Sequence, residues 1–313
     1  MTPRSIIIDA DPGHDDAVAL LLALASPELD TLGITTVAGN VPLALTSRNA
    51  LSIVELAGRG DVPVFAGADK PLLRAPISAE HVHGQRGLGG VSLPEPTRPL
   101  ATENAVDFII RTLREKPAGS VTLCALGPLT NLALALMQAP GIAARLREIV
   151  LMGGAYGAGG NVTPCAEFNL YADPHAAQVV FRSGAPIVML PLDVTHQVVS
   201  TRERIAAIGE LGNRAGRTVA QLLSFAASTG IENFGGDGAP LHDPCVVAYL
   251  LRPELFGGRH INVEIETGSA LTMGMSVADW WGVSGRPANA TFMRTVDATG
   301  FYALLGERLA RLP

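Results

Sequence analysis

The chain contains few aromatic residues, few charged residues and little cysteine for its length. Of its 313 residues, 5% are aromatic and 17% are charged, and only three are cysteines. A charged fraction below the roughly 25% of a typical soluble domain predicts a large core and a buried subunit interface. Cys124, Cys165 and Cys245 lie far apart in the sequence. This spacing favours neither a disulfide framework nor a zinc site.

Positive charge is scarcer than negative charge. Lys and Arg number 23 against 29 Asp and Glu, which gives a formal net charge of −6. No stripe of Lys and Arg is present to displace counterions, so the composition argues against a nucleic-acid partner. The sequence also lacks a Gly-x-x-x-x-Gly-Lys-Ser/Thr loop and has no Arg cluster near its acidic residues. A phosphorylated ligand is therefore disfavoured.

Long hydrophobic runs are absent as well. The longest apolar segments, such as residues 17–25, fall well short of the roughly 18 residues needed to cross a membrane. Strand-like sequence begins by Ile6, which leaves no room for a signal peptide. We therefore expect a cytoplasmic protein with no membrane partner.

The chain reads as one α/β domain, residues 1–313, because no linker, repeat or low-complexity tract divides it. Strand patterns cover residues 5–9, 30–38, 62–66, 121–125, 148–152 and 186–190, and helical patterns cover residues 16–26, 46–57, 103–115, 129–137 and 174–183. This alternation predicts an open, mostly parallel, Rossmann-like sheet with helices on both faces. Residues 77–96, rich in Gly, His and Pro, are too long for a connector and are expected to form a lid.

Four aspartates stand between a buried strand and a helix: Asp9, Asp11, Asp15 and Asp16. Two like charges about 4 Å apart repel by roughly 4 kcal/mol at an effective dielectric near 20. The cluster therefore needs a cation, a shared proton, or side chains that point apart. Oxygen ligands favour a hard cation such as Ca²⁺ or Mg²⁺. The alternative is structural, with Asp15 and Asp16 capping the helix and Asp9 ending the strand.

Other polar residues follow the ends of later predicted strands. Ligands of such sheets bind beyond the carboxyl ends of the strands, so these residues are expected to meet Asp9 and Asp11 at one rim. They are Asn40, the Leu126-Gly127 pair, Asn161, Glu167 and Asn169. Asp243, next to His242 at the start of a late helix, offers a further carboxylate. Without other evidence, Asp243 could simply cap the helix, and His242 could be an ordinary core or surface histidine.

Two other functions fit part of the pattern. A phosphohydrolase of the haloacid-dehalogenase type would use Asp9 as nucleophile and Mg²⁺, but that family usually has Thr or Val where this chain has Gly13. This alternative also gives no role to Asn161, Glu167, Asn169 or His242. A non-catalytic ribose- or nucleoside-binding protein is the second alternative, although such proteins are usually exported.

Ordered motifs then resemble a known family. Asp9-Ala-Asp-Pro-Gly-His-Asp-Asp16 is similar to the amino-terminal signature of the inosine–uridine-preferring nucleoside hydrolases. Further blocks follow in the family's order: Thr36-Val-Ala-Gly-Asn40, Leu126-Gly-Pro-Leu-Thr-Asn131, Met152-Gly-Gly154, residues 161–169, Asp173-Pro174 and His242-Asp243. The resemblance implies the nucleoside hydrolase fold and Ca²⁺-dependent hydrolysis of the N-glycosidic bond of ribonucleosides to free base and ribose, in nucleoside salvage or catabolism. It also implies a homotetramer or homodimer.

The resemblance further implies roles for individual residues. The Ca²⁺ ligands would be the carboxylates of Asp11, Asp16 and Asp243 and the backbone carbonyl of Leu126. Asp11 would also act as general base toward a water held by the metal. His242 would protonate the leaving base, with His83 as a second histidine on the base side. The residues expected to bind substrate are Asp15, Asn40, Met152, Asn161, Glu167, Asn169 and Phe234.

The chain departs from the family pattern in the lid. Relatives often have His-Gly-x-x-Gly-Leu-Asp-Gly, whereas Gly89 stands here in place of the Asp. Purine-specific relatives stack the base between tryptophans, but this chain has His242 beside Asp243. That difference favours the histidine-bearing group, which prefers inosine and uridine or pyrimidine nucleosides. His14 and His81 are expected to be structural or solvent-exposed.

Overall fold

A computed structural model describes residues 2–234 and 238–313, and the side chains of all of these except 229–234. The strands of the main sheet are β1 (Arg4–Ala10), β2 (Leu29–Thr36), β3 (Val64–Ala66), β4 (Val121–Ala125), β5 (Leu146–Met152), β6 (Ile187–Leu190), β9 (Phe256–Ile265), β10 (Ser276–Asp279) and β11 (Ala290–Val296). A small second sheet pairs β7 (Val199–Thr201) with β8 (Gly238–Pro240).

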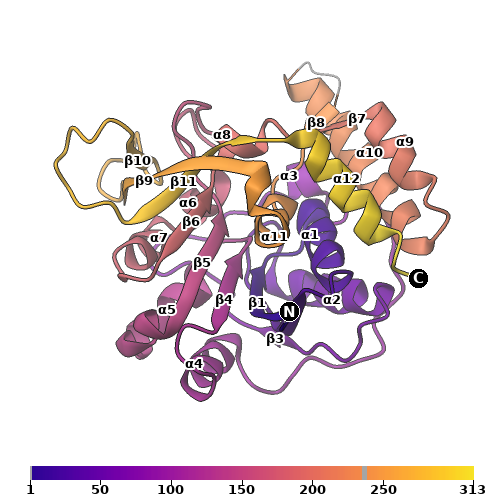
Figure 1. The fold of residues 1–313 in the computed structure, drawn as a ribbon, viewed down its shortest axis with the longest axis horizontal. Helices are drawn as coiled ribbons and strands as arrows, with labels where there is room; N and C mark the ends of the chain where they lie inside the picture. Colours follow the sequence, from indigo (N-terminus) through magenta and orange to yellow (C-terminus); the bar gives the residue numbers. More distant parts are fainter. Residues whose placement is uncertain (1, 235–237) are drawn as a thin grey trace.

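Helices connect most of these strands (Figure 1). They are α1 (His14–Leu24), α2 (Leu43–Leu56), α3 (Glu80–His83), α4 (Ala105–Glu115), α5 (Thr130–Gln138), α6 (Phe168–Ala172), α7 (Pro174–Phe181), α8 (Leu192–Thr195), α9 (Arg202–Gly209), α10 (Arg214–Phe234), α11 (Pro244–Leu251) and α12 (Ala298–Leu309). Short 3₁₀ segments occupy Pro140–Arg145 and Pro253–Leu255. No helix in the described ranges is both long and apolar enough to cross a lipid bilayer.

The main sheet is largely parallel. Within the described residues its nine strands follow the order β10-β9-β11-β6-β5-β4-β1-β2-β3. Neighbouring strands from β11 to β3 are parallel, whereas β9 runs antiparallel to both β10 and β11. The predicted α/β fold with a mostly parallel sheet is therefore confirmed. The antiparallel edge was not foreseen in detail, because β10 is short and half exposed and carries little apolar pattern.

Alternate side chains of β1 enter two different cores, as expected of a central strand buried on both faces. Ile6 and Ile8 belong to one core, which also contains the apolar residues of α1, α10, α11 and α12. Ile7 belongs to the other, with residues of α4, α5 and α7. Figure 1 shows these two groups of helices on either side of the sheet. Helices on both faces are thus confirmed.

The strand order brings the predicted polar residues together. The sheet places β2, β1, β4 and β5 side by side and parallel, so their carboxyl ends share one edge. Asp11 and Leu126 directly follow β1 and β4, and Asn40 lies in the turn that follows β2. The chain leaves β1 in one direction toward β2 and later returns on the other side as β4. That reversal is where ligands of open α/β sheets bind.

The lid stretch is only partly irregular. Residues 77–96 contain the single-turn helix α3 and then a run of turns in which Gly84, Gly87, Gly89 and Gly90 all have positive φ. The amide of Gly89 donates to the carbonyl of His83 at 2.9 Å, which closes the loop on itself. The glycines permit this tight path because L side chains rarely adopt positive φ.

Candidate active site

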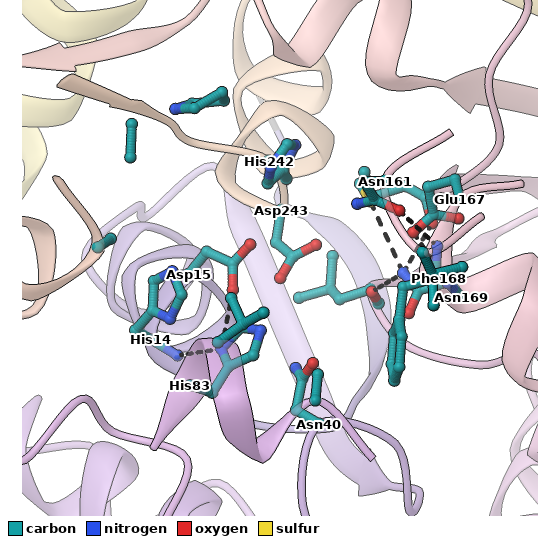
Figure 2. Close-up of a pocket in the computed structure, with 18 of the residues that line it drawn as sticks. His14, Asp15, Asn40, His83, Asn161, Glu167, Phe168, Asn169, His242 and Asp243 are labelled. Carbon is teal, nitrogen blue, oxygen red and sulfur yellow. Dashed lines mark hydrogen bonds and ion pairs between the residues drawn. The ribbon is translucent and has the colours of Figure 1, made fainter. Parts of the chain in front are cut away.

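A cavity of about 430 Å³ opens at the carboxyl edge of the sheet, within the size range of small-molecule sites. The β1–α1 turn, the lid, the 161–169 loop and the start of α11 form its walls (Figure 2). Ten of the predicted site residues line it: Asp15, Asn40, His83, Leu126, Met152, Asn161, Glu167, Asn169, His242 and Asp243. Asp11 and Asp16 are buried behind that lining, at 1% and 0% exposure. The side chain of Phe234 lies outside the described residues.

Asp11 has one engaged and one free carboxylate oxygen. Its Oδ2 accepts a hydrogen bond from the backbone N–H of Asn40 at 2.7 Å. Its Oδ1 is buried and has no hydrogen-bond partner among the described residues. A Cβ at either Gly39 or Gly127 would collide with this carboxylate. Both glycines are therefore needed for the backbone to approach Asp11 closely.

Asp16 combines the two roles that the sequence left open. Its Oδ2 accepts from the backbone N–H of Gly13 at 3.0 Å and from Nδ2 of Asn40 at 3.1 Å, so it closes the first turn of α1. It also lies beside Asp15 and Asp243, and carboxylate oxygens of the three residues fall within 4.8 Å of one another. Capping thus accounts for the position of Asp16 but not for the surrounding negative charge.

Asp9 is set apart from the other acids. Its Oδ1 accepts from Thr35 Oγ1 at 2.5 Å and from Asn131 Nδ2 at 2.8 Å. It is fully buried but does not line the cavity. Asp9 therefore ties β1 to β2 and to the start of α5.

The buried carboxylates repel one another strongly. Burial and the nearby Asp16 charge hold the pKa of Asp11 well above its ordinary range, and burial together with Asp15 does the same for Asp243. Burial and Asp15 raise the pKa of Asp16 to about 7. Burial alone would also raise the pKa of Asp15, but the neighbouring histidines outweigh it and leave that pKa below its ordinary value.

This donor set fits a hard divalent cation. The available ligands are carboxylate and carbonyl oxygens, and one oxygen each of Asp11 and Asp15 is buried without a hydrogen-bond partner among the described residues. A cation would satisfy these oxygens and offset the repulsion that raises the pKa values. The carbonyl of Leu126 already accepts from Asn169 Nδ2 at 2.6 Å. A carbonyl has two lone pairs, so a second interaction is still open to it.

The opposite wall carries three polar residues from the 161–169 loop. Glu167 caps α6, accepting from the backbone N–H groups of Asn169 and Gly154 at 2.8 Å each, and burial raises its pKa to about 7. Asn161 accepts from the backbone N–H of Phe168 at 3.0 Å through Oδ1. Nδ2 of Asn169 also reaches the carbonyl of Met152, at 3.2 Å. The loop is thus held in a fixed geometry facing the acids.

Two histidines stack on the lid side. The rings of His14 and His83 lie 4.2 Å apart between centroids, and His83 Nδ1 accepts from the backbone N–H of His14 at 3.4 Å. The same nitrogen is 4.0 Å from Oδ1 of Asp15. Burial, and next the His14 ring, lower the pKa of His83 to about 3. A Cβ at Gly13 would collide with the His83 ring, so this glycine makes room for it.

His14 is buried and lines the cavity, so of the two expectations for it exposure is wrong and a structural role stays a prediction. Its place between Gly13 and Asp15, directly before a predicted substrate ligand, was the signal in the sequence. His81 is exposed and lies at the rim of the same cavity.

His242 stands across the cavity from the lid (Figure 2). Its Nδ1 is 2.7 Å from Oγ1 of Thr195, and its ring centroid is 5.8 Å from that of His196. Burial lowers the pKa of His242 to about 4, below the ordinary value near 6.5 that made it attractive as an acid. His242 is therefore neutral near pH 7.

Two solved structures that superpose on this chain are named as nucleoside hydrolases. A purine-preferring ribonucleoside hydrolase from Gardnerella vaginalis superposes with a TM-score of 0.92 at 33% identity, covering 98% of each chain. A plant nucleoside hydrolase superposes with a TM-score of 0.91 at 35% identity, covering 98% of this chain and 99% of the other. The fold and the acid-floored cavity thus define a nucleoside hydrolase.

Sequence comparison makes the family explicit. The model described as inosine-uridine preferring nucleoside hydrolase matches residues 6–303. The pyrimidine-specific ribonucleoside hydrolase RihA of Escherichia coli (strain K12) is 49% identical over 308 residues, 97% of each chain. An uncharacterized protein of Schizosaccharomyces pombe is 58% identical over 308 residues, 98% of this chain and 99% of the other. The chain belongs to the inosine-uridine preferring nucleoside hydrolase family, which is metal-dependent, and it is an enzyme acting on N-glycosyl compounds.

Proposed function

We propose that this enzyme hydrolyses ribonucleosides to free base and ribose with Ca²⁺ held by Asp11, Asp16, Asp243 and the carbonyl of Leu126. The observation that carries the proposal is the buried Oδ1 of Asp11, which has no hydrogen-bond partner among the described residues and lies behind the lining of a cavity that also carries histidines. When bound, Ca²⁺ would orient the ribose diol and make a water easier to deprotonate near neutral pH.

The sugar would lie between the acids and the 161–169 loop. Asp15 and Asn40 would hold the 2′- and 3′-hydroxyl side, and Asn161, Glu167 and Asn169 the 3′- and 5′-hydroxyl side. As the N-glycosidic bond breaks, positive charge develops on the ring, as in other glycosidases. The surrounding carboxylate and amide oxygens stabilise that charge without having to reorganise.

Asp11 would be the general base. Its Oδ1 takes a proton from water while the water oxygen bonds to C1′ of the sugar. Its Oδ2 stays with the N–H of Asn40, which keeps the carboxylate in a fixed orientation. The metal would lower the raised pKa of Asp11, so that the base is ionised at neutral pH.

The departing base takes both electrons of the broken bond and needs a donor. Because His242 is neutral near pH 7, it would donate a hydrogen bond from a ring N–H rather than act as a pre-protonated acid. His83 would make a second such contact from the lid. Hydrogen bonds to the developing negative charge lower the barrier for a poor leaving group.

We infer a preference for inosine and uridine or for pyrimidine nucleosides. The described lining of the cavity contains no tryptophan, and its base side carries His83, Val82, Ala226, Ala239 and Pro240. The relative at 49% identity is named pyrimidine-specific, whereas the structural neighbour named purine-preferring is 33% identical.

A panel of nucleosides tests the proposal, with free base read by absorbance, with and without a chelator. We expect turnover on uridine, cytidine and inosine, loss with chelator, and recovery with Ca²⁺. Phosphate release from a phosphomonoester would instead support a dehalogenase-type phosphohydrolase. Binding of nucleosides without release of base would support a non-catalytic receptor. Recovery with Mg²⁺ or Mn²⁺ but not Ca²⁺ would overturn the choice of metal alone.

The predicted homotetramer or homodimer and the cytoplasmic location stay predictions from the sequence. Size-exclusion chromatography with light scattering measures the mass of the assembly, and fractionation of the native cells tests the location.

A further inference from the structure

Thr195 contacts a histidine of the proposed active site from outside the cavity. It is the last residue of α8 and is fully buried. Its Oγ1 lies 2.7 Å from Nδ1 of His242, a residue 47 positions later in the chain. Thr195 does not line the cavity, so it has no direct access to a bound substrate.

The direction of this hydrogen bond follows from the surroundings of the hydroxyl. A buried O–H donor that lacks an acceptor costs free energy, so buried hydroxyls almost always donate. Across the described part of the chain, His242 Nδ1 is the one recorded hydrogen-bond partner of Thr195 Oγ1. This favours the hydroxyl as donor and Nδ1 as acceptor in the 2.7 Å contact.

We propose that Thr195 is a positioning residue that holds His242 in the tautomer with its proton on Nε2, facing the departing base. A neutral imidazole carries one ring proton, so an accepting Nδ1 leaves that proton on Nε2. Nε2 is the other ring nitrogen, separated from Nδ1 by Cε1. Because Nδ1 contacts buried Thr195, Nε2 is the ring nitrogen left to reach the cavity that His242 lines.

Both ring position and proton position matter for this chemistry. In the other tautomer Nε2 would present a lone pair to an oxygen or nitrogen of the base that is gaining negative charge, and the contact would be repulsive. The Thr195 bond also limits rotation of the ring, which keeps the donor in reach of the base. This inference rests on the proposed hydrolase function and on the place of His242 in it.

Thr195→Val tests the inference, because valine has nearly the same shape without the hydroxyl. We expect kcat/KM on uridine and inosine to fall by about 10- to 100-fold, within the range for loss of a positioned proton donor. Hydrolysis of p-nitrophenyl riboside, whose leaving group needs no donor, should change by less than about 3-fold. Thr195→Ser keeps the hydroxyl and should recover most of the natural activity.

Thr130→Val provides a matched control. Thr130 is also a buried threonine, but its Oγ1 donates to Asp173 at 2.8 Å, away from the cavity. Any loss in this variant should be the same for both kinds of substrate. Equal losses on both substrates in Thr195→Val, or no loss on either, would overturn the role of Thr195. Failure of the unmodified enzyme to release base would overturn the proposed function instead.

Nitrogen NMR of [¹⁵N]histidine-labelled wild-type protein gives a reading that does not depend on a variant folding. We expect an unprotonated Nδ1 and a protonated Nε2 for His242 at neutral pH, with the signals assigned by their loss in His242→Gln. A protonated Nδ1 and an unprotonated Nε2 would contradict the inference, whatever the kinetics of the variants.

Discussion

The backbone N–H of Asn40 donates to Oδ2 of Asp11 at 2.7 Å, while Oδ1 of the same carboxylate is buried with no partner among the described residues. One oxygen is thus fixed by the turn that follows β2, and the other is available to a cation or a water. The two oxygens of Asp11 therefore have different roles, which the count of acids in the sequence could not show.

Asp11→Asn should remove the base while keeping the Asn40 contact through the amide oxygen. We expect kcat to fall by at least about 10³-fold, as expected for loss of a general base with a weakened metal site. The loss should be similar on uridine and on p-nitrophenyl riboside, because attack by water is needed for both. Steady-state assays on both substrates measure this, and near-normal turnover would exclude Asp11 as the base.

His242→Ala should lower kcat/KM for substrates with poor leaving groups far more than for those with good ones. The pH dependence of kcat/KM near pH 6.5 should be the same in the variant as in the wild type. Burial lowers the pKa of His242 to about 4, so the ring is neutral from about pH 5.5 to pH 8 and its contribution should be constant there. We expect a loss of about 10²-fold on uridine and little on p-nitrophenyl riboside. A fall of wild-type kcat/KM with an apparent pKa near 6.5, abolished in the variant, would contradict the neutral-donor role.

Asp9→Asn should reduce the dependence of stability on pH. Burial raises the pKa of Asp9 from 3.8 to about 6. The folded state therefore binds this proton more tightly than the unfolded chain. The resulting stabilisation is complete below pH 3.8, where both states are protonated, and is lost as the pH rises through 6. The shift in the pKa of Asp9 corresponds to a total change of about 3 kcal/mol in the free energy of unfolding.

Urea unfolding of the chelated protein at pH 4 and pH 8 measures this effect. The difference in unfolding free energy between the two pH values should shrink by about 2 kcal/mol in Asp9→Asn, because the amide does not titrate. An unchanged difference would mean that Asp9 ionises in the folded state as easily as in the unfolded chain.

Gly89→Ala should displace the lid. A Cβ at Gly89 would collide with the ring of Phe225 on α10, whereas a Cβ at Gly90 would meet nothing within 4 Å. Both glycines have positive φ, so both alanine variants carry similar backbone strain of about 1 kcal/mol. We expect KM for uridine to rise in Gly89→Ala by clearly more than in Gly90→Ala. Equal KM values would show that the Phe225 contact does not position the lid.

The part of the fold nearest the active site could be predicted from the sequence because its strands are short, apolar and buried on both faces. Ile6, Ile7 and Ile8 give a clear central strand, and its neighbours have the same character. β10 and the β7–β8 pair were missed because strands of three or four residues are too short to show a distinctive periodicity. Their pairing is decided by tertiary contacts that local sequence does not encode.

Residues of the candidate site were predictable where they belong to a motif and not where they depend on packing. Asp11 and Asp243 stand in such motifs. His14 also stands in one, but the motif suggested no role for it, and a lone threonine such as Thr195 has no pattern of its own. The neutral state of His242 was also out of reach, because it comes from burial by elements that are distant in the sequence.

The turn at Gly13 borders both halves of the cavity. Its N–H is held by Asp16, and its bare α-carbon faces the ring of His83. In the proposed mechanism, the same turn therefore supports both the contacts to the sugar and the contacts to the base. An engineer who wishes to change the preferred base should leave residues 12–14 alone and start from the α10 side of the cavity, where Ala226 lies and which contributes none of the proposed cation ligands.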